Sequence, residues 1–364
     1  MSRHFETIRI GFMPLLDAAI PVIAARGGFG ARHGLNIELV RETSWANVRD
    51  RLAIGHFDAA HLLAPLPIAA ALGLTPFEVP LIAPMTLGHG GNAITVSASV
   101  WAMMQAALPD LAVNDPVSTG DALRRVVSAR QANGEAPLVF AVVHAISSHN
   151  YELRHWLHAS GIDPDKDVAI AIVPPPYMPD ALAAGRINGF CVGEPWNSRA
   201  AAAGSGAIIL TKAALWPHSP DKVLAMRADW AEKHPALVNK LMLAMVEAAE
   251  FCGDPANLSE LITIMGGPDI LDVPPEAIRP ALTGRMRLAD AEQLVAGMIE
   301  FARHGANIPS LADAQWYLDQ MIRWKQVHSA AKPDLATVFR PDLYYRAAQE
   351  LGIRSPDQGS GGAL

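Results

Sequence analysis

Short apolar runs alternate with helical patterns along the first 72 residues, and this alternation restricts the fold more than any other feature. Buried strands are predicted at residues 8–12, 35–40 and 58–63. Asp17 stands where the N-cap of a first helix is expected, and Ser44 where that of a second is expected. A third helix is predicted at 67–72. Strands that alternate with helices are typical of a mainly parallel sheet, so we predict the α/β class.

A second alternating stretch follows a glycine-rich run at residues 88–92. Its strands are predicted at 93–97, 138–143, 168–173 and 188–192, and its helices at 119–132, 150–160 and 179–184. A strand is predicted at 223–226, and helices at 235–252, 276–283, 290–304 and 312–327. The first strands have too few local helices to cover their sheet, so we expect the helical C-terminal third to supply the remainder.

These patterns predict two α/β lobes with one inserted in the other. Lobe I is expected at 1–94 plus 218–355, lobe II at 95–217, and a disordered glycine-rich tail at 356–364. Two crossings between the lobes are expected, near 93–97 and 214–224. A ligand would then bind in the cleft, where strand ends and helix N-termini converge.

Composition excludes several functions. The net charge is −7 and the basic residues are scattered, which argues against a nucleic-acid groove. No stretch of about 18 apolar residues is present for insertion into a membrane. The start MSRHFETIRIGF lacks the pattern of a secretory signal, which predicts a cytoplasmic protein, or a periplasmic one if a leader has been removed.

Polar residues gather where strands are expected to end or helices to begin. Trp45 is a candidate ligand residue or a partly buried aromatic, and His61 a candidate supporting residue or a satisfied strand histidine. Gly91 and Asn92 belong to a run that either forms a simple turn or lets backbone amides approach an anion.

Three further candidates also allow a structural interpretation. Ser148 or its neighbour caps a helix, which makes His149 either a ligand residue or incidental. Lys222 follows Asp221, so the two form either a solvated surface pair or part of a site. Glu194 either caps the next helix or accepts a hydrogen bond from a residue of the cleft.

Catalytic and metal motifs are missing from the sequence. There is no GxSxG or HExxH pattern, and no cluster of His, Cys and carboxylates at metal-ligand spacing. We therefore predict a ligand-binding protein with no catalytic residue, no metal and no cofactor.

Four motifs carry a family resemblance: ETSWANVRDRLAIGHFDAAHLLAPLP (42–67), GIDPDKDVAIAIVPPP (161–176), INGFCVGEPWN (187–197) and SPDKVLAMRADW (219–230). In this order they resemble the nitrate- and bicarbonate-binding proteins of ABC importers. The resemblance implies the type II periplasmic-binding fold, a two-lobed clamshell with mixed sheets, and an anion in its cleft.

The resemblance also implies roles for individual residues. The binding tryptophan, amide and histidine of the family correspond to Trp45, Asn92 and His149, although nitrate binders usually carry glutamine at the amide position. Lys222 corresponds to the lysine that marks nitrate preference, where bicarbonate binders tend to place an acid that holds a metal ion. Charge compensation by this lysine is expected to matter most. Glu194 and Trp196 are expected at the cleft rim, where they position donors.

Three functions are compatible with this resemblance. Because no leader is seen, the chain resembles most the cytoplasmic nitrate/nitrite sensors, which hold an RNA-binding antiterminator protein and release it when the anion binds. The alternative is the solute-binding subunit of a nitrate or nitrite importer, or less readily of a bicarbonate importer. An enzyme on the same fold, such as a thiamine-pyrimidine synthase, lacks support because its cysteine-rich motif is missing.

Overall fold

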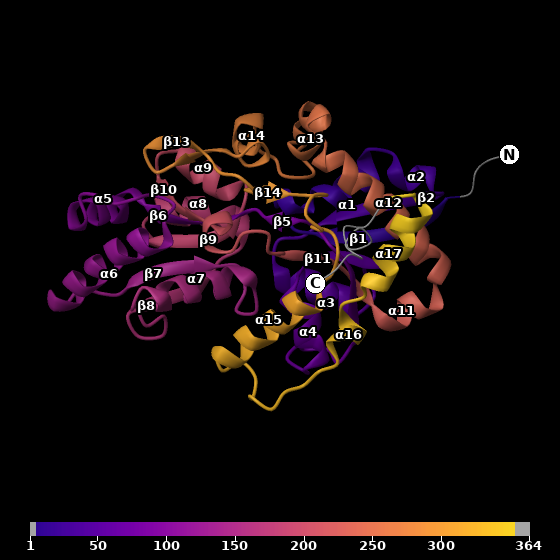
Figure 1. Cartoon of the computed structure of the whole chain (residues 1–364), viewed down its shortest axis with the longest axis horizontal. Helices are drawn as coiled ribbons and strands as arrows, with labels where there is room; N and C mark the ends of the chain where they lie inside the picture. Colours follow the sequence, from indigo (N-terminus) through magenta and orange to yellow (C-terminus); the bar gives the residue numbers. More distant parts are fainter. Residues whose placement is uncertain (1–4, 354–364) are drawn as a thin grey trace, which may run out of the picture. The chain divides into compact units, whose positions relative to one another are not determined.

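Two mixed β-sheets form the framework of the protein (Figure 1). The computed structural model describes residues 5–353, which fall into two compact units. Unit 1 contains the described residues up to His89, then His218–Leu271 and the chain from Glu300 onward, and unit 2 contains Gly90–Pro217 and Asp272–Ile299. The sheet of each unit has five strands.

In unit 1 the strand order is β2-β1-β3-β11-β4. β1 runs parallel to β2 and β3, whereas β11 runs antiparallel to both β3 and β4. The strands are β1 (Glu6–Phe12), β2 (Leu35–Arg41), β3 (Ala59–Leu63), β4 (Leu81–Thr86) and β11 (Lys222–Arg227). β3 is buried along its whole length, which suits its central position in the sheet. β4 lies at the edge of the sheet but is also fully buried, because α4, α16 and α17 pack against it.

Unit 2 repeats this pattern of pairing in the order β8-β7-β9-β6-β10. β7 is parallel to β8 and β9, and β6 is antiparallel to β9 and β10. The strands are β6 (Asn92–Ser97), β7 (Leu138–Val142), β8 (Val168–Ile172), β9 (Gly189–Gly193) and β10 (Gly206–Thr211). The predicted mixed sheets are therefore confirmed.

Helices connect and cover the strands of each unit. Those of unit 1 are η1 (Leu16–Ala18), α1 (Ala19–Arg26), α2 (Phe29–Arg32), α3 (Trp45–Ala53), α4 (Pro65–Ala71), α11 (Ala228–Lys233), α12 (Pro235–Gly253), η3 (Pro255–Asn257), α13 (Leu258–Met265), α15 (Leu311–Arg323), α16 (Leu335–Val338) and α17 (Pro341–Glu350). Those of unit 2 are α5 (Ala98–Ala107), α6 (Pro116–Ala132), α7 (Ser148–Ala159), η2 (Pro175–Tyr177), α8 (Met178–Ala183), α9 (Trp196–Ala202), α10 (Lys212–Leu215) and α14 (Pro275–Thr283).

The C-terminal helices of unit 1 help to cover the sheet that the first strands form, as the sequence predicts. α12 packs against α1 and α17, and α17 packs against β4. The middle of α12 is buried on all sides, from Leu241 to Val246, as expected for a helix inside the core. In unit 2 the core gathers around Phe140, Trp156 and Leu153, from β7 and α7. None of the helices in residues 5–353 combines the length and apolar character needed to cross a bilayer.

Residues 290–304 contradict the predicted helix. They form β13 (Ala291–Leu294), which pairs with β12 (Arg285–Leu288), and then β14 (Ile299–Glu300), which pairs with β5 (His89–Gly90). Ala289 has a φ of 46° in the turn before this segment, and Gly297 has a φ of 66° within it, so the segment does not form one continuous helix. The amide of Ala289 donates to the carbonyl of Ile208, which anchors the hairpin to the sheet of unit 2.

The domain division also differs from the expected one. Residues 272–299 were expected in lobe I but belong to unit 2, because α14 packs on α9 and β12 on β10. The chain therefore passes between the units at four points rather than two, after His89, Pro217, Leu271 and Ile299. The predicted disordered tail at 356–364 lies outside the described residues.

Candidate functional site

A buried ionic cluster lies at the carboxyl end of the parallel strands of unit 1. Lys222 begins β11 opposite Leu63, the last residue of β3. Its ammonium forms ion pairs with Asp221 and with Asp17, whose Oδ2 lies 2.9 Å away. His61, on β3, places its Nε2 2.9 Å from the other carboxylate oxygen of Asp17.

Mutual attraction keeps Lys222 and Asp17 charged although burial opposes it. Burial alone would lower the pKa of Lys222, but Asp17 and Asp221 outweigh it and the pKa is raised. Burial alone would raise the pKa of Asp17, but Lys222 and His61 outweigh it and hold the pKa well below its usual range. For His61 burial prevails over Asp17, so its pKa is lowered and the imidazole is neutral at pH 7.

Trp45 completes the cluster as the first residue of α3. Ser44 caps this helix as predicted, because its Oγ accepts from the amide of Asn47. The indole lies 5.4 Å from the ammonium of Lys222 and 5.1 Å from the imidazole of His61, measured to ring centroids. Trp45 is 1% exposed, and its Nε1–H has no hydrogen-bond partner among the described residues. A buried donor of this kind favours a bound acceptor.

This geometry changes the expected role of Lys222. The lysine does pair with Asp221, but the pair is buried rather than solvated. Two carboxylates face one ammonium, so Lys222 does not offer the uncompensated positive charge that the sequence led us to expect. An ammonium has three donors and two are used here, which leaves one for a ligand.

A second buried cluster lies at the corresponding edge of the sheet in unit 2. Asn92 begins β6 opposite Gly193, and its Nδ2 donates to both carboxylate oxygens of Glu152, at 3.3 and 3.1 Å. Lys212 forms an ion pair of 2.9 Å with Glu152 Oε1, and both side chains are almost fully buried. The amide donor expected to meet an anion is thus held by Glu152. The Oδ1 of Asn92 is buried and has no partner among residues 5–353.

The glycine run before Asn92 is folded against unit 2 itself. The amide of Gly91 donates to the carbonyl of Met298 at 2.6 Å, and its carbonyl accepts from the amide of Glu194. Gly91 therefore does not present its backbone N–H to a ligand, in contrast to the expectation. Its φ of 87° explains why glycine stands there.

The serine–histidine segment starts α7. Ser147 caps the helix by accepting from the amide of Asn150, so the cap is the neighbour of Ser148. Ser148 and His149 are both buried in the first turn. This position keeps a ligand role for His149 open as a proposal.

Glu194 is a buried carboxyl group at the end of β9. Its Oε2 accepts from the amide of Ser198, which agrees with the capping interpretation, whereas its Oε1 has no partner among the described residues. Burial raises the pKa of Glu194 to about 7, against the hydrogen bonds from Ser198 and Asn197 that lower it. Trp196 is 1% exposed, with the guanidinium of Arg199 over its ring. Both residues are internal to unit 2 and hold the start of α9.

Four charged residues of these clusters are not predicted as site residues by the sequence. Asp17 was expected as an N-cap, but it lies inside η1 and bonds to Lys222 instead. Asp221 was considered only as a surface partner, and Glu152 and Lys212 were not singled out. Their position inside or next to apolar strands or helices could have indicated buried ion pairs, because a charged residue is rarely buried unless it is paired.

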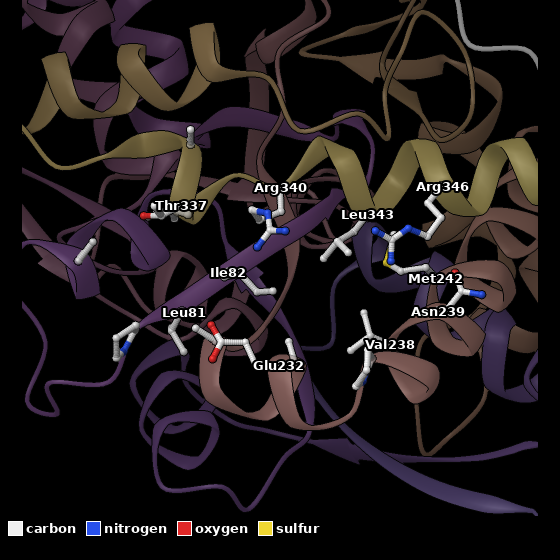
Figure 2. A pocket seen from close by; sticks show the side chains of 17 residues that line it. Leu81, Ile82, Glu232, Val238, Asn239, Met242, Thr337, Arg340, Leu343 and Arg346 are labelled. Carbon is white, nitrogen blue, oxygen red and sulfur yellow. The ribbon is translucent and has the colours of Figure 1, made fainter.

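A mainly apolar pocket of unit 1 lies elsewhere (Figure 2). It has a volume of about 510 Å³ and is lined mainly by apolar side chains. Figure 2 shows Arg340, Leu343 and Arg346 along one side, and Glu232 and Val238 along the other. None of the predicted ligand residues lines it, so we do not assign the anion to this pocket.

Comparison with known proteins shows which proteins this chain resembles in sequence and in structure. The structure matches that of the periplasmic nitrate-binding protein NrtA from Synechocystis with a TM-score of 0.88, at 26% identity and over 98% of this chain and 92% of that one. The nitrate/nitrite binding protein NrtA of Synechococcus elongatus is 33% identical over 95% of this chain and 78% of that protein. The bicarbonate transport ATP-binding protein CmpC of the same organism is also 33% identical, over 95% of this chain. The chain spans 50% of the length of CmpC.

The two mixed sheets and the buried polar clusters at their strand ends define the class, a protein with the α/β fold of the periplasmic binding proteins. Residues 3–266 match the NMT1-like family, and the chain belongs to that family, in the group of nitrate- and bicarbonate-binding proteins. The predicted fold class and the predicted family are both confirmed.

Proposed function

We propose that this protein binds a small planar oxyanion, nitrate or nitrite, as the solute-binding component of an ATP-driven importer. The main support is the similarity to a nitrate/nitrite binding protein along nearly the whole chain. Binding rather than catalysis is favoured because this relative is named as a binding protein.

Lys222 and Trp45 are the proposed donors in unit 1. The third N–H of the Lys222 ammonium and the N–H of Trp45 both lack an acceptor among residues 5–353. Nitrate only accepts hydrogen bonds, so two donors close to each other suit it. Because Asp17 and Asp221 already offset the charge of Lys222, the anion is held by directed hydrogen bonds more than by net charge. Roles for Asn92 and His149 of unit 2 remain part of the proposal.

Bicarbonate is the second candidate, since CmpC is named for bicarbonate transport. A lysine at position 222 favours nitrate. A buried ammonium would repel the metal ion that an acidic residue could hold at this position.

Thermal unfolding with a panel of anions tests the proposal. Nitrate and nitrite should raise the melting temperature, because a ligand that binds only the native state stabilises it by mass action. Bicarbonate, with or without calcium, and sulfate should leave it unchanged. A shift with bicarbonate and none with nitrate or nitrite would refute the anion assignment.

The sensor function remains a separate hypothesis. It rests on where the chain begins, whereas the importer function rests on relatives that align with nearly all of it, so we propose the latter. Affinity capture from cells grown with and without nitrate distinguishes them. A permease and an ATPase in the captured material, with the protein in the periplasm, support the importer. An RNA-binding antiterminator that leaves when nitrate is added would support the sensor instead.

A further inference from the structure

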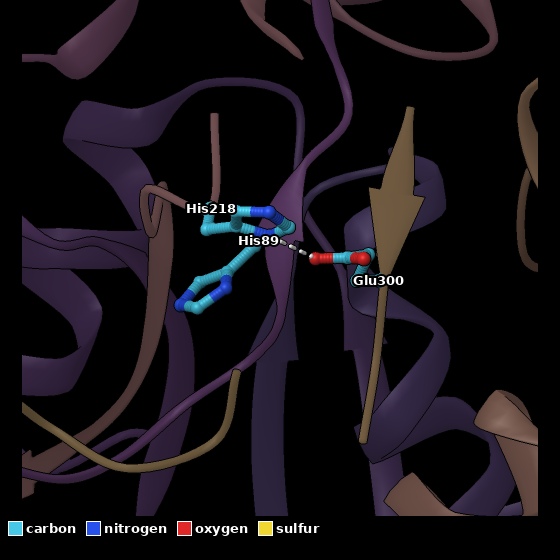
Figure 3. Close-up of side chains that lie close together, drawn as sticks. All are labelled: His89, His218 and Glu300. Carbon is cyan, nitrogen blue, oxygen red and sulfur yellow. Dashed lines mark hydrogen bonds and ion pairs between the residues drawn. The ribbon is translucent and has the colours of Figure 1, made fainter. Parts of the chain in front are cut away.

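Three side chains of unit 1 form a further cluster, which contains none of the predicted anion-binding residues (Figure 3). They are His89, His218 and Glu300, and one ligand atom from each lies within 4.8 Å of the other two. The Nδ1 of His218 lies 2.8 Å from Oε2 of Glu300. Figure 3 shows the imidazole of His89 beside that of His218, with Glu300 reaching toward them from β14.

The backbone fixes the spacing of these residues. His89 lies in β5, which pairs with β14 and so with Glu300. His89 also forms a β-bridge with Pro220, two residues beyond His218. Gly88 permits the close approach, because a Cβ at that position would lie 2.6 Å from the carbonyl oxygen of Glu300. The cluster is therefore built by main-chain pairing and does not depend on flexible side chains alone.

Two histidines of this region hold an uncommon backbone conformation. The φ angles are 51° at His218 and 55° at His304. Such angles are unfavourable for residues with a side chain, and they occur most often where a ligand or a tight turn requires them. His304 places its Nδ1 3.0 Å from the Oε1 of Glu300, so the carboxylate is held on both oxygens by imidazoles.

The solvent exposure of the three side chains would allow an ion to reach them. His89 is buried and the side chain of Glu300 is 11% exposed, whereas that of His218 is about half exposed at 52%. The inner ligands are thus ordered by packing, and the outer histidine faces solvent.

We propose that His89, His218 and Glu300 bind a divalent transition-metal ion, with zinc as the preferred ion. Two imidazoles and one carboxylate match the donor set of zinc sites that keep a position open for water. Ligand atoms in such a site lie about 3.3 Å apart, so a spacing within 4.8 Å needs only small side-chain adjustments. Calcium and magnesium prefer oxygen ligands, which disfavours them here. His304 orients Glu300 through its second oxygen and is not itself a ligand.

The three proposed ligands lie where the chain leaves or enters unit 1. His89, His218 and Glu300 are each the unit 1 residue next to a point where the chain passes between the units. An ion bound to all three ties together three chain segments that lead into unit 2. This inference is independent of the anion assignment and stands if that assignment fails.

Calorimetric titration of the full chain with Zn²⁺ tests the proposal, on protein without an affinity tag and after treatment with a chelator. One ion per chain should bind with micromolar affinity or better. Zn²⁺ should also raise the melting temperature, and Co²⁺ should give the visible absorption of a four- or five-coordinate site. His218→Ala and Glu300→Gln should each weaken binding at least about tenfold. Calcium should not bind.

His33→Ala is the matched control, because His33 forms another His–Glu pair in unit 1, with Glu247 at 2.7 Å. It should bind zinc as the parent protein does. His304→Ala should weaken binding less than His218→Ala does. Equal affinity in the His218→Ala and His33→Ala variants, or no binding to the parent protein, would overturn the proposal. Circular dichroism of each variant shows whether a loss of binding reflects unfolding.

Discussion

Lys222 and Asn92 occupy equivalent positions in the two sheets. Each is the first residue of the antiparallel strand of its sheet, and each pairs with the last residue of the neighbouring central strand, Leu63 or Gly193. Each bonds a buried carboxylate, Asp17 or Glu152 respectively. The two units thus place a nitrogen donor and an acid at the same point of one topology.

A second pair of residues, His61 and Cys191, is also equivalent in the two sheets. His61 and Cys191 occupy matching registers on β3 and β9, opposite Leu224 and Ile94. His61 contacts Asp17, and the Sγ of Cys191 lies 3.8 Å from Oε2 of Glu152. Both clusters lie at the carboxyl ends of parallel strands, where α/β proteins commonly bind their ligands.

Removing the Lys222 ammonium should destabilise the protein as well as weaken anion binding. Lys222→Met leaves Asp17 and Asp221 buried without their cation, a change that costs about 3–5 kcal/mol. Denaturant unfolding measures the loss. Lys166→Met is the control, because Lys166 pairs with Asp163 on the surface, where solvent screens the pair and its loss should change stability little.

A second substitution should show energetic coupling with Lys222→Met. Asp17→Asn removes one of the two carboxylates, so the double variant should be less destabilised than the sum of the single variants by about 0.5–3 kcal/mol. Additive effects of the two substitutions would show that the buried pair does not couple in this way.

Lys222→Glu would add a third acid to the cluster, and we expect it to unfold the protein rather than only abolish binding.

Glu194 should make stability depend on pH between about 4.5 and 7. Its pKa is higher in the folded protein than in the unfolded chain, so its contribution is present below pH 4.5 and is lost as the pH rises through 7. Glu194→Gln should remove up to about 3 kcal/mol of this dependence. The difference between parent and variant, measured by unfolding across this range, isolates the effect. Glu260→Gln, at an exposed acid, controls for the substitution itself.

Gly90→Ala should be more destabilising than Gly73→Ala, although both glycines have positive φ angles, 76° and 68°. The backbone strain of about 1–2 kcal/mol is common to both. At Gly90 an added Cβ would lie 2.5 Å from the carbonyl oxygen of Met298, whereas at Gly73 it meets nothing within 4 Å. Equal losses of unfolding free energy in the two variants would contradict the tight packing of the glycine run against Met298.

The sequence predicts most of the framework because strands and their turns leave local signals. The strand at 35–40 and the cap at Ser44 are both confirmed. The helix predicted at 290–304 failed because the apolar residues of that segment also suit a hairpin, and a non-glycine turn at Ala289 gives no clear local signal.

The ionic clusters could not be predicted because their members are distant in sequence. Asp17 meets Lys222 only through the pairing of β3 with β11, and Glu152 meets Lys212 through the packing of α7 and α10. His89, His218 and Glu300 likewise come from three separate segments, so motif spacing could not indicate them.

Calorimetric titration with nitrate, comparing the parent protein with Trp45→Phe and Trp156→Phe, tests the central claim most directly. Trp45→Phe removes an N–H that has no partner in the described part of the chain, whereas the Nε1 of Trp156 donates to the carbonyl of Pro116 in unit 2. A lost hydrogen bond to a charged group weakens binding by about 1.5–3 kcal/mol. We expect micromolar nitrate binding in the parent, a loss of this size in Trp45→Phe, and unchanged affinity in Trp156→Phe. Undiminished affinity in a folded Trp45→Phe variant, or no binding to the parent protein, would contradict the account.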